Sequence, residues 1–356
     1  MKVLMIGAGR NVRGGVSSVV NGYYEAGLDR KCELTYLATM EDGSKLKKLG
    51  VAALARVRFE KLMREADILH VHMSSDNSFY RKAVFIRRAY RMHKKIIIHM
   101  HGSTFDLFYK ERCNKRQKRE VRDIFRLAER VIALSDDWKA FLAKYICPAE
   151  KIRVIYNGVP VPETGKKEYG NRRILFLGIL GQRKGTYDLL KVLPEVCRVY
   201  PDVHVYFGGD GEREQAERLS RELGISGHVT FLGWVRGRKK EKLLRGCSMY
   251  VLPTYHEGMP MSVLEAMSYG MAVISTWVGG IPHIITDGEN GLLCEAGDEK
   301  RLQELILRLL ASEAERSKLG VNAKGLIRDV FDVKKTVDEV ARLYEEVMLK
   351  AGGNAL

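Results

Sequence analysis

The sequence predicts an α/β protein in which two doubly wound parallel sheets follow each other along the chain. Its 356 residues exceed one ordinary hydrophobic core and suit two domains of roughly 150–200 residues each. In both halves short apolar runs alternate with longer amphipathic runs, which is typical of parallel sheets covered by helices. Residues 157–171, rich in Gly, Pro and polar side chains, separate the two series and are the expected linker.

The first half alternates expected strands and helices in chain order. The strands are 2–6, 33–37, 68–72, 95–100 and 130–133, with 153–156 as the last. The helices between them are 16–27, 44–65, 77–92, 108–127 and 136–144. Parallel sheets of this kind bind ligands at the carboxyl ends of their strands, so the segments that follow the strands are the place to look for a site.

The second half repeats the pattern. Its expected strands are 173–177, 204–207, 229–232, 249–252 and 272–275, and its helices are 185–199, 212–223, 238–245 and 261–269, the last opened by Pro260. The tail, 299–349, is mostly helical. We therefore expect an N-terminal domain over 1–160, a second domain over 161–330, and a C-terminal helix in 331–356 that packs back toward the N-terminal domain, with a cleft between the two domains.

Composition excludes several classes of protein. The hydrophobic content of 46% with 29% charged residues is ordinary for a globular protein, and no apolar run approaches the ~20 residues of a membrane span. The N-terminus lacks the apolar core and cleavage site of a signal peptide and looks like a buried first strand. The six cysteines stand singly without a CxxC pair, which argues against a zinc knuckle and favours reduced thiols in a cytosolic protein.

The positive charge is concentrated in the first half. Residues 1–160 carry 32 Lys and Arg against 17 Asp and Glu, whereas residues 161–356 carry 28 against 27. Such a field suits an anionic surface, either phospholipid or nucleic acid, although a solvated basic face without a partner would look the same. The amphipathic basic segments 81–95 and 110–130 favour docking on anionic lipid, unless their apolar residues are simply the core face.

The most informative segment is 252–270, Leu-Pro-Thr-Tyr-His-Glu-Gly-Met-Pro-Met-Ser-Val-Leu-Glu-Ala-Met-Ser-Tyr-Gly. Seven residues separate Glu257, in the loop after a strand, from Glu265, in the helix that Pro260 opens. Free N–H groups at a helix start suit sugar hydroxyls or a phosphate. An ionised carboxylate only accepts hydrogen bonds, which is what a vicinal diol such as ribose needs.

This segment resembles the Glu-x7-Glu signature of family 4 retaining glycosyltransferases of the bacterial polysaccharide-biosynthesis type. The resemblance covers nearly the whole chain and is most specific over 172–293. It implies the GT-B fold, two Rossmann-like domains with an interdomain cleft. Two positions depart from the family pattern: Ile179 stands where an Arg is usual, and His283 where a Glu is frequent. Arg183, next to Lys184, could supply the missing charge.

The resemblance also implies a site. Cations at Arg183 and Lys184 would stabilise the departing diphosphate, which suits a site with no Asp-x-Asp metal motif in its strand-end loops. Gly279 and Gly280 would let the backbone approach the diphosphate. The implied catalytic residues are His101, Arg183, Lys184 and Glu257. The implied donor-binding residues are Gly14, Gly15, Gly233, Gly258, Met259, Pro260, Met261 and Glu265, with Trp234 beside the base; no metal ligand and no cofactor are implied.

Two features of the first half limit the alternatives. A G-x-G-x-x-G dinucleotide fingerprint would require Gly at position 12, which is Val12, so a nicotinamide dehydrogenase is excluded and Gly14-Gly15 instead match the family's phosphate-contacting turn. His101 matches the family histidine near the donor sugar. His72 ends the neighbouring strand and could also face the cleft, whereas His70, His93 and His99 are expected to be structural.

The resemblance therefore implies transfer of a hexose or N-acetylhexosamine, with retention of configuration and without a metal, from a nucleotide-sugar to a glycan or lipid-linked glycan. A UDP-sugar is favoured over a GDP-sugar. The expected place is the cytoplasm, at the inner face of the cell membrane, in cell-surface polysaccharide assembly. The alternatives are an epimerase or phosphorylase on the same scaffold and, without a recognised motif, a nucleic-acid-binding protein. Base, sugar, acceptor, linkage and oligomeric state stay open.

Overall fold

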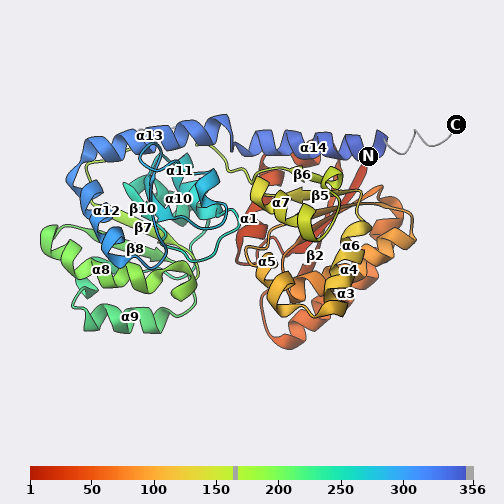
Figure 1. The fold of residues 1–356 in the computed structure, drawn as a ribbon, viewed down its shortest axis with the longest axis horizontal. Coiled ribbons are helices and arrows are strands. Elements are labelled where there is room, and N and C mark those ends of the chain that lie inside the picture. Colours follow the sequence, from red (N-terminus) through yellow and green to blue (C-terminus); the bar gives the residue numbers. More distant parts are fainter. Residues whose placement is uncertain (163–166, 350–356) are drawn as a thin grey trace. The chain divides into compact units, whose positions relative to one another are not determined.

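A computed structural model describes residues 1–162 and 167–349, apart from the side chains of 45–49 (Figure 1). The chain divides into two compact units: unit 1 comprises Met1–Gly158 and Val333–Leu356, and unit 2 comprises Val159–Asp332. Residues 163–166 of the expected linker and 350–356 of the expected C-terminal segment lie outside the described residues.

Unit 1 is built on a six-stranded parallel sheet in the order β2-β1-β3-β4-β5-β6. Its strands are β1 (Lys2–Ala8), β2 (Glu33–Met40), β3 (Ile68–Met73), β4 (Lys95–Met100), β5 (Arg130–Ala133) and β6 (Ile152–Val154). Its helices are α1 (Gly15–Glu25), α2 (Leu28–Lys31), α3 (Lys45–Glu65), α4 (Asn77–Arg91), α5 (Phe105–Leu107), α6 (Lys115–Arg126), α7 (Asp136–Tyr145) and α14 (Val333–Leu349), with a π-turn at Phe108–Arg112 and a 3₁₀ turn at Ala149–Lys151.

Unit 2 has a second six-stranded parallel sheet, in the order β12-β11-β10-β7-β8-β9. Its strands are β7 (Arg173–Leu177), β8 (His204–Gly208), β9 (Val229–Phe231), β10 (Met249–Val251), β11 (Ala272–Thr276) and β12 (Leu292–Cys294). Its helices are α8 (Thr186–Val199), α9 (Arg213–Glu222), α10 (Gly237–Gly246), α11 (Met261–Ser268), α12 (Glu299–Ala311) and α13 (Glu313–Asp329), with 3₁₀ turns at Gln182–Lys184, Ser226–His228 and Ile281–His283.

The predicted fold class, two doubly wound parallel α/β units, is confirmed, with local corrections. The single helix expected over 108–127 is wrong: the chain breaks at Cys113, and Asn114 starts α6 anew. There the Asn114 side chain accepts from the Gln117 amide at 2.9 Å while the Gln117 side chain accepts from the Asn114 amide, a reciprocal cap that ends any continuous helix. The tail is mostly helical, as expected, and consists of α12, α13 and α14. Between the first two, the Ser312 hydroxyl caps α13 by accepting from the Glu315 amide at 3.1 Å.

Two central strands of unit 1 position its polar groups. All of β3 is buried, as is β4 after Lys95, because helices cover both faces of the sheet. Their parallel register pairs His72 with His99 and Met73 with Met100, so the segments that follow the two strands leave the sheet side by side. The amide of His101 continues this pairing by donating to the Met73 carbonyl oxygen at 2.7 Å. Among the described residues, no helix has both the length and the apolar character needed to cross a bilayer.

Candidate functional site

Two loops of unit 2 hold each other at the carboxyl ends of β7 and β10. The carbonyl oxygen of Arg183 accepts from the Tyr255 amide at 2.9 Å and from the Thr254 hydroxyl at 3.0 Å. Gly185 has a left-handed φ of 70°, and a Cβ there would lie 1.9 Å from the Pro253 carbonyl oxygen, so only glycine fits. The short turn after β7 is therefore fixed against the loop that carries Glu257.

This junction brings together two predicted catalytic residues of opposite charge. The Lys184 ammonium forms an ion pair with Glu257 Oε1, and the two side chains are only 13% and 9% exposed. Arg183 differs: it is exposed, and its guanidinium donates to the His256 carbonyl oxygen at 3.3 Å. A ligand that reached this loop would therefore meet one enclosed ion pair and, at the edge of the loop, one exposed guanidinium group that has no acidic partner among the described residues.

A third loop, which follows β11, packs against the backbone of Glu257 and Gly258. A Cβ on Gly279, which has a φ of 54°, would lie 1.7 Å from the Glu257 carbonyl oxygen, and one on Gly280 would lie 2.0 Å from the Gly258 carbonyl oxygen. From the sequence, these glycines are expected to allow close approach to a diphosphate. In the structure the space at their Cβ positions is taken by the neighbouring backbone, so packing within the protein already requires both glycines.

The predicted donor-binding helix α11 begins one residue after Pro260, which is its N-cap. Met259 and Pro260 are buried and Met261 is half-buried. Glu265 lies one turn into α11, where its Oε1 pairs with Lys240 Nζ at 2.7 Å. Sequence reasoning missed Lys240; the only signal was the run of basic residues that opens α10, which any solvated helix could carry.

Gly233 and Trp234, expected beside the base, follow the edge strand β9. Gly233 has a φ of 65° and bridges to Gly209 in the turn after β8. The Trp234 amide donates to Asp210 Oδ1 at 3.1 Å. That amide is thus already used within unit 2, which leaves its expected contact with a base as a prediction.

In unit 1 the predicted residues lie at the carboxyl ends of β1 and β4. Gly14 is the N-cap of α1, with a φ of 147° and no atom within 4 Å of its Cβ position, and Gly15 is exposed as the first residue of that helix. The start of α1 is therefore open backbone, as a phosphate site at a helix start would need. His101 follows β4 and is part-exposed.

His101 belongs to a stack of four histidines, in which His70 and His72 come from β3, His99 comes from β4, and His101 itself directly follows β4. Its Nε2 lies 2.8 Å from His72 Nδ1, and His70 Nε2 lies 3.2 Å from His99 Nδ1. Burial lowers the pKa of His101 and of His70 to about 3 and holds the pKa of His72 and His99 well below the ordinary value, so all four are neutral at pH 7. His70 and His99 were expected to be structural, and the stack itself was not predicted from the sequence.

Three of these histidines lie close enough together to raise the question of a metal site. Single ring nitrogens of His70, His72 and His99 lie within 4.8 Å of one another. Their rings are stacked, with interplanar angles of 15–29°. A zinc ion needs nitrogen lone pairs converging on one point at about 2.0–2.1 Å. Stacked rings send their lone pairs in nearly parallel planes, so this arrangement does not fit a metal.

The basic segment 81–95 is less exposed than its sequence suggested. Lys82 is only 4% exposed and donates to the Ser78 hydroxyl at 2.8 Å, and burial lowers its pKa to about 7. Arg87 pairs with Glu120 on α6, and Arg88 with Glu60 on α3. Phe85 and Ile86, like Ile124 and Phe125 of the second basic segment, are core residues, as the alternative interpretation held.

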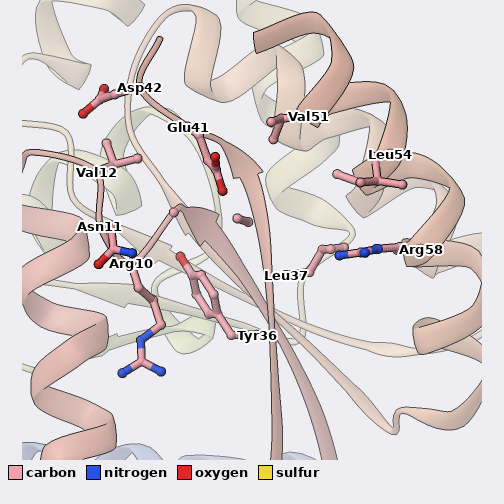
Figure 2. A pocket seen from close by; sticks show the side chains of 13 residues that line it. Arg10, Asn11, Val12, Tyr36, Leu37, Glu41, Asp42, Val51, Leu54 and Arg58 are labelled. Atoms are coloured by element: carbon pink, nitrogen blue, oxygen red, sulfur yellow. The ribbon is translucent and has the colours of Figure 1, made fainter. Parts of the chain in front are cut away.

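A pocket of about 560 Å³ opens in unit 1 beside the loop that follows β1 (Figure 2). Leu37, Val51 and Leu54 form an apolar side, and Arg10, Asn11, Glu41, Asp42 and Arg58 supply polar groups. None of these residues was expected from the sequence, since they come from β2, from α3 and from the loops that follow β1 and β2, and meet only in the folded unit.

Each unit thus gathers its own share of the predicted residues. Arg183, Lys184, Glu257, Gly258, Met259, Pro260, Met261 and Glu265 form one continuous region of unit 2, with Gly233 at the end of its edge strand. Gly14, Gly15 and His101 lie at the carboxyl edge of the unit 1 sheet. Both sets occupy the edge at which parallel sheets bind ligands.

Comparison with known proteins assigns the class. Residues 14–162 match the model of Glycosyltransferase Family 4, and residues 162–326 match that of Glycosyl transferases group 1. The two matches together cover most of the chain, and the chain belongs to this family of glycosyltransferases.

Individual relatives of the chain are also glycosyltransferases. The chain is 26% identical over 281 residues to the uncharacterized glycosyltransferase MJ1069 of Methanocaldococcus jannaschii, covering 74% of this chain and 71% of that protein. It is 30% identical over 171 residues to the lipopolysaccharide core biosynthesis glycosyltransferase LpsE of Rhizobium meliloti, covering 48% of each. The match thus spans about half the length of the second relative.

A solved structure confirms the GT-B fold. Anabaena Alr3699/HepE in complex with UDP superposes with a TM-score of 0.78 over 97% of this chain and all of that chain, at 19% identity. At this identity the likeness establishes the fold.

Proposed function

We propose that this chain is a retaining, metal-independent glycosyltransferase that moves a hexose or N-acetylhexosamine from a nucleotide-sugar to a glycan or lipid-linked glycan. The observation that carries the proposal is the fixed junction of unit 2, where the enclosed Lys184–Glu257 pair lies next to the start of α11 and its Glu265. Charged groups held in place by surrounding loops are already oriented for reaction.

The roles follow from the chemistry of each group. The departing nucleoside diphosphate gains negative charge in the transition state, which Lys184 and the exposed Arg183 would offset. Glu257 and the backbone of Gly258–Met261 would hold sugar hydroxyls. Glu265 would accept from the ribose diol after exchanging its contact with Lys240. Cationic side chains in these positions would take the place of a divalent ion.

UDP is the nucleotide we favour, with GDP second. The support is the HepE structure, which shares the fold and was determined with UDP. LpsE acts in lipopolysaccharide core biosynthesis, and this likeness supports a role for the present chain in cell-surface polysaccharide assembly. The amphipathic pocket of unit 1 is our candidate for part of the acceptor site, because sugar rings present both apolar faces and hydroxyl groups.

We also propose that the protein binds an anionic membrane through unit 1. On α3, Leu54 and Val57 are 51% and 72% exposed and alternate with the exposed Arg56 and Arg58. Such a surface can insert apolar side chains between headgroups while its guanidinium groups contact lipid phosphates. It would place the enzyme peripherally, at the inner face of the cell membrane.

The test is to incubate the full chain with UDP-sugars and GDP-sugars, without metal and with EDTA present, and to follow the anomeric protons by NMR. A transferase releases the nucleoside diphosphate, and its product keeps the anomeric configuration of the donor. Conversion of one nucleotide-sugar into another without release of UDP would indicate an epimerase. An inverted product, or a strict requirement for added Mg²⁺ or Mn²⁺, would contradict the mechanism proposed.

A further inference from the structure

Two of the four stacked histidines of unit 1 have a buried ring nitrogen without a hydrogen-bond partner, and this determines which nitrogen of each ring carries the proton. His72 Nε2 and His99 Nε2 are both enclosed and have no hydrogen-bond partner. Each residue uses its other nitrogen: His72 Nδ1 faces His101 Nε2 at 2.8 Å, and His99 Nδ1 faces His70 Nε2 at 3.2 Å. A neutral imidazole carries one N–H, so its position determines which partner donates.

Two arrangements are possible for the His72–His101 pair. If His72 carried its proton on Nε2, a buried N–H group would point at no acceptor. If it carries the proton on Nδ1, the enclosed Nε2 keeps only a lone pair. Orphaned buried N–H donors are rarer in proteins than under-satisfied acceptors, so the second arrangement is favoured.

The surroundings favour the same choice. The Tyr23 hydroxyl is also enclosed without a partner, and the Tyr23 ring lies 6.1 Å from the His72 ring and 6.4 Å from the His99 ring, centre to centre. If both Nε2 atoms are unprotonated, the enclosed groups without a partner are the Tyr23 hydroxyl and two acceptor nitrogens. If both were protonated, two N–H donors without an acceptor would be added to the Tyr23 O–H donor.

The second pair gives the same result independently. If His99 donates from Nδ1 to His70 Nε2, His70 must carry its own proton on Nδ1. That nitrogen lies 2.5 Å from the Tyr344 hydroxyl on α14, which can accept it. The His70–Tyr344, His70–His99 and His72–His101 hydrogen bonds are then each made with one donor and one acceptor.

We propose that His72 fixes His101 in the tautomer that carries its proton on Nδ1, so that His101 presents a neutral N–H donor to a bound ligand. His101 Nε2 accepts from His72, which leaves Nδ1 as the nitrogen that a ligand can reach on this part-exposed side chain. Because all four rings stay neutral at pH 7, the donor role does not depend on protonation. His72 is therefore a positioning residue.

This assigns a chemical role to His101 that deepens the proposed function and rests on it. An Nδ1–H group can donate to an oxygen of the donor sugar or of the leaving diphosphate. It cannot take up a proton at that atom, so His101 does not act there as a general base. A neutral imidazole that donates from a fixed tautomer stabilises charge developing on oxygen without a proton transfer of its own.

The tautomer can be measured directly. The full chain labelled with ¹⁵N-histidine is examined by long-range ¹H–¹⁵N correlation NMR at pH 7, where protonated and bare ring nitrogens resonate far apart. We expect the proton of His101 on Nδ1 in the unaltered protein. Finding it on Nε2 overturns the proposal without any variant, so misfolding cannot obscure the result.

Two variants test the part played by His72. His72→Phe removes the donor and keeps a ring, and the proton of His101 should then move to Nε2 and kcat for sugar transfer should fall about 100-fold with little change in donor KM. His72→Asn keeps an amide N–H donor and should restore the Nδ1 form and part of kcat. Tyr344→Phe, at the far end of the other pair, should leave His101 unchanged. Retention of the Nδ1 form in His72→Phe would overturn the role of His72.

The NMR result and the proposed function can fail separately. If His101 carries its proton on Nδ1 but the chain transfers no sugar, the tautomer assignment holds and the proposed function is wrong. If sugar is transferred while His101 carries its proton on Nε2, the reverse is true.

Discussion

At the scale of single residues, we propose that the enclosed Lys184–Glu257 pair contributes to both stability and catalysis, and substitution can measure each contribution. Removing one member of a buried ion pair leaves an uncompensated charge, which typically costs about 3–5 kcal/mol. We expect Lys184→Met to destabilise unit 2 by an amount near that range and to lower kcat by about 10²–10³-fold. Urea unfolding followed through Trp277, with transfer assays, measures both.

Arg183→Met is the matched control, because Arg183 belongs to the same turn but is exposed. It should change the free energy of unfolding by less than about 0.5 kcal/mol while still weakening the diphosphate contact. Equal destabilisation by the two substitutions would show that Lys184 and Glu257 do not form an enclosed pair in solution.

Residue types and spacing predicted only part of the site. The Glu-x7-Glu string and the Lys before Gly185 could be identified from the sequence because each carries a local signature. Lys240 could not, since its contact with Glu265 depends on how α10 packs beside α11. The His72–His101 pair depends on the register of β3 and β4, which no local pattern specifies.

At the scale of loops and strands, Gly279 separates a steric requirement from a conformational one. Gly279→Ala must place a Cβ 1.7 Å from the Glu257 carbonyl oxygen, in addition to adopting a φ of 54°. Gly237→Ala faces nearly the same φ, 55°, with no atom within 4 Å of the Cβ. We expect about 1–2 kcal/mol of destabilisation for Gly237→Ala and clearly more for Gly279→Ala, measured by urea unfolding of unit 2. Similar losses would mean that the loop relaxes away from Glu257.

The histidine stack of β3 and β4 predicts acid sensitivity of unit 1. The folded pKa of His70 and His101, about 3, lies below the unfolded value near 6.5, so the unfolded chain binds more protons between those limits. Stability is therefore fully present above pH 6.5 and falls as pH decreases toward 3, by up to about 1.4 kcal/mol per pH unit for each histidine.

The measurement uses Trp138 as the reporter of unit 1, with Trp234 and Trp277 replaced by Phe. His70→Phe should make the dependence of unfolding free energy on pH, between 4 and 6, shallower by about 1.4 kcal/mol per pH unit. His93→Asn, outside the stack, should leave it unchanged. An unaltered slope in His70→Phe would mean that this ring is already protonated or exposed.

The elements themselves were largely predictable, and the misses have physical causes. The apolar runs predicted β4, β5 and β7 with the first and last residues that the structure shows, because buried parallel strands are continuously hydrophobic. The three-residue β12 was missed because it is too short to stand out from a loop. The broken helix after β4 was missed because its amphipathic pattern continues across the break, and only the capping pair at Asn114 and Gln117 marks a new start.

At the scale of the whole molecule, the uneven charge predicts salt-dependent binding to anionic membranes. Each basic residue near such a surface contributes about 1 kcal/mol, so replacing Arg56, Arg58 and Arg91 by Glu should weaken binding to phosphatidylglycerol vesicles by at least about tenfold at low salt. The matched control replaces the exposed Arg218, Lys300 and Lys318 of unit 2. Vesicle sedimentation measures both, and equal losses would assign the binding to net charge alone.

The fold class was predictable at this scale because alternating strands and helices admit few topologies. The cleft expected between the two halves stays a prediction, as does the cofactor-free mechanism. The excess of basic residues in the first half of the chain suggested membrane binding. It could not show that Lys82 is buried or that Arg87 and Arg88 form ion pairs within unit 1.

The central claim is that unit 2 binds the nucleotide of a sugar donor through Glu265, and calorimetric titration with UDP, GDP and ADP in the presence of EDTA tests it most directly. We predict micromolar binding of one nucleotide, with UDP favoured. Glu265→Ala should weaken it about 10–100-fold, because a charge-assisted hydrogen bond contributes about 1.5–3 kcal/mol. A folded protein that binds none of the three, or one whose affinity is unchanged by Glu265→Ala, would contradict the donor site described above.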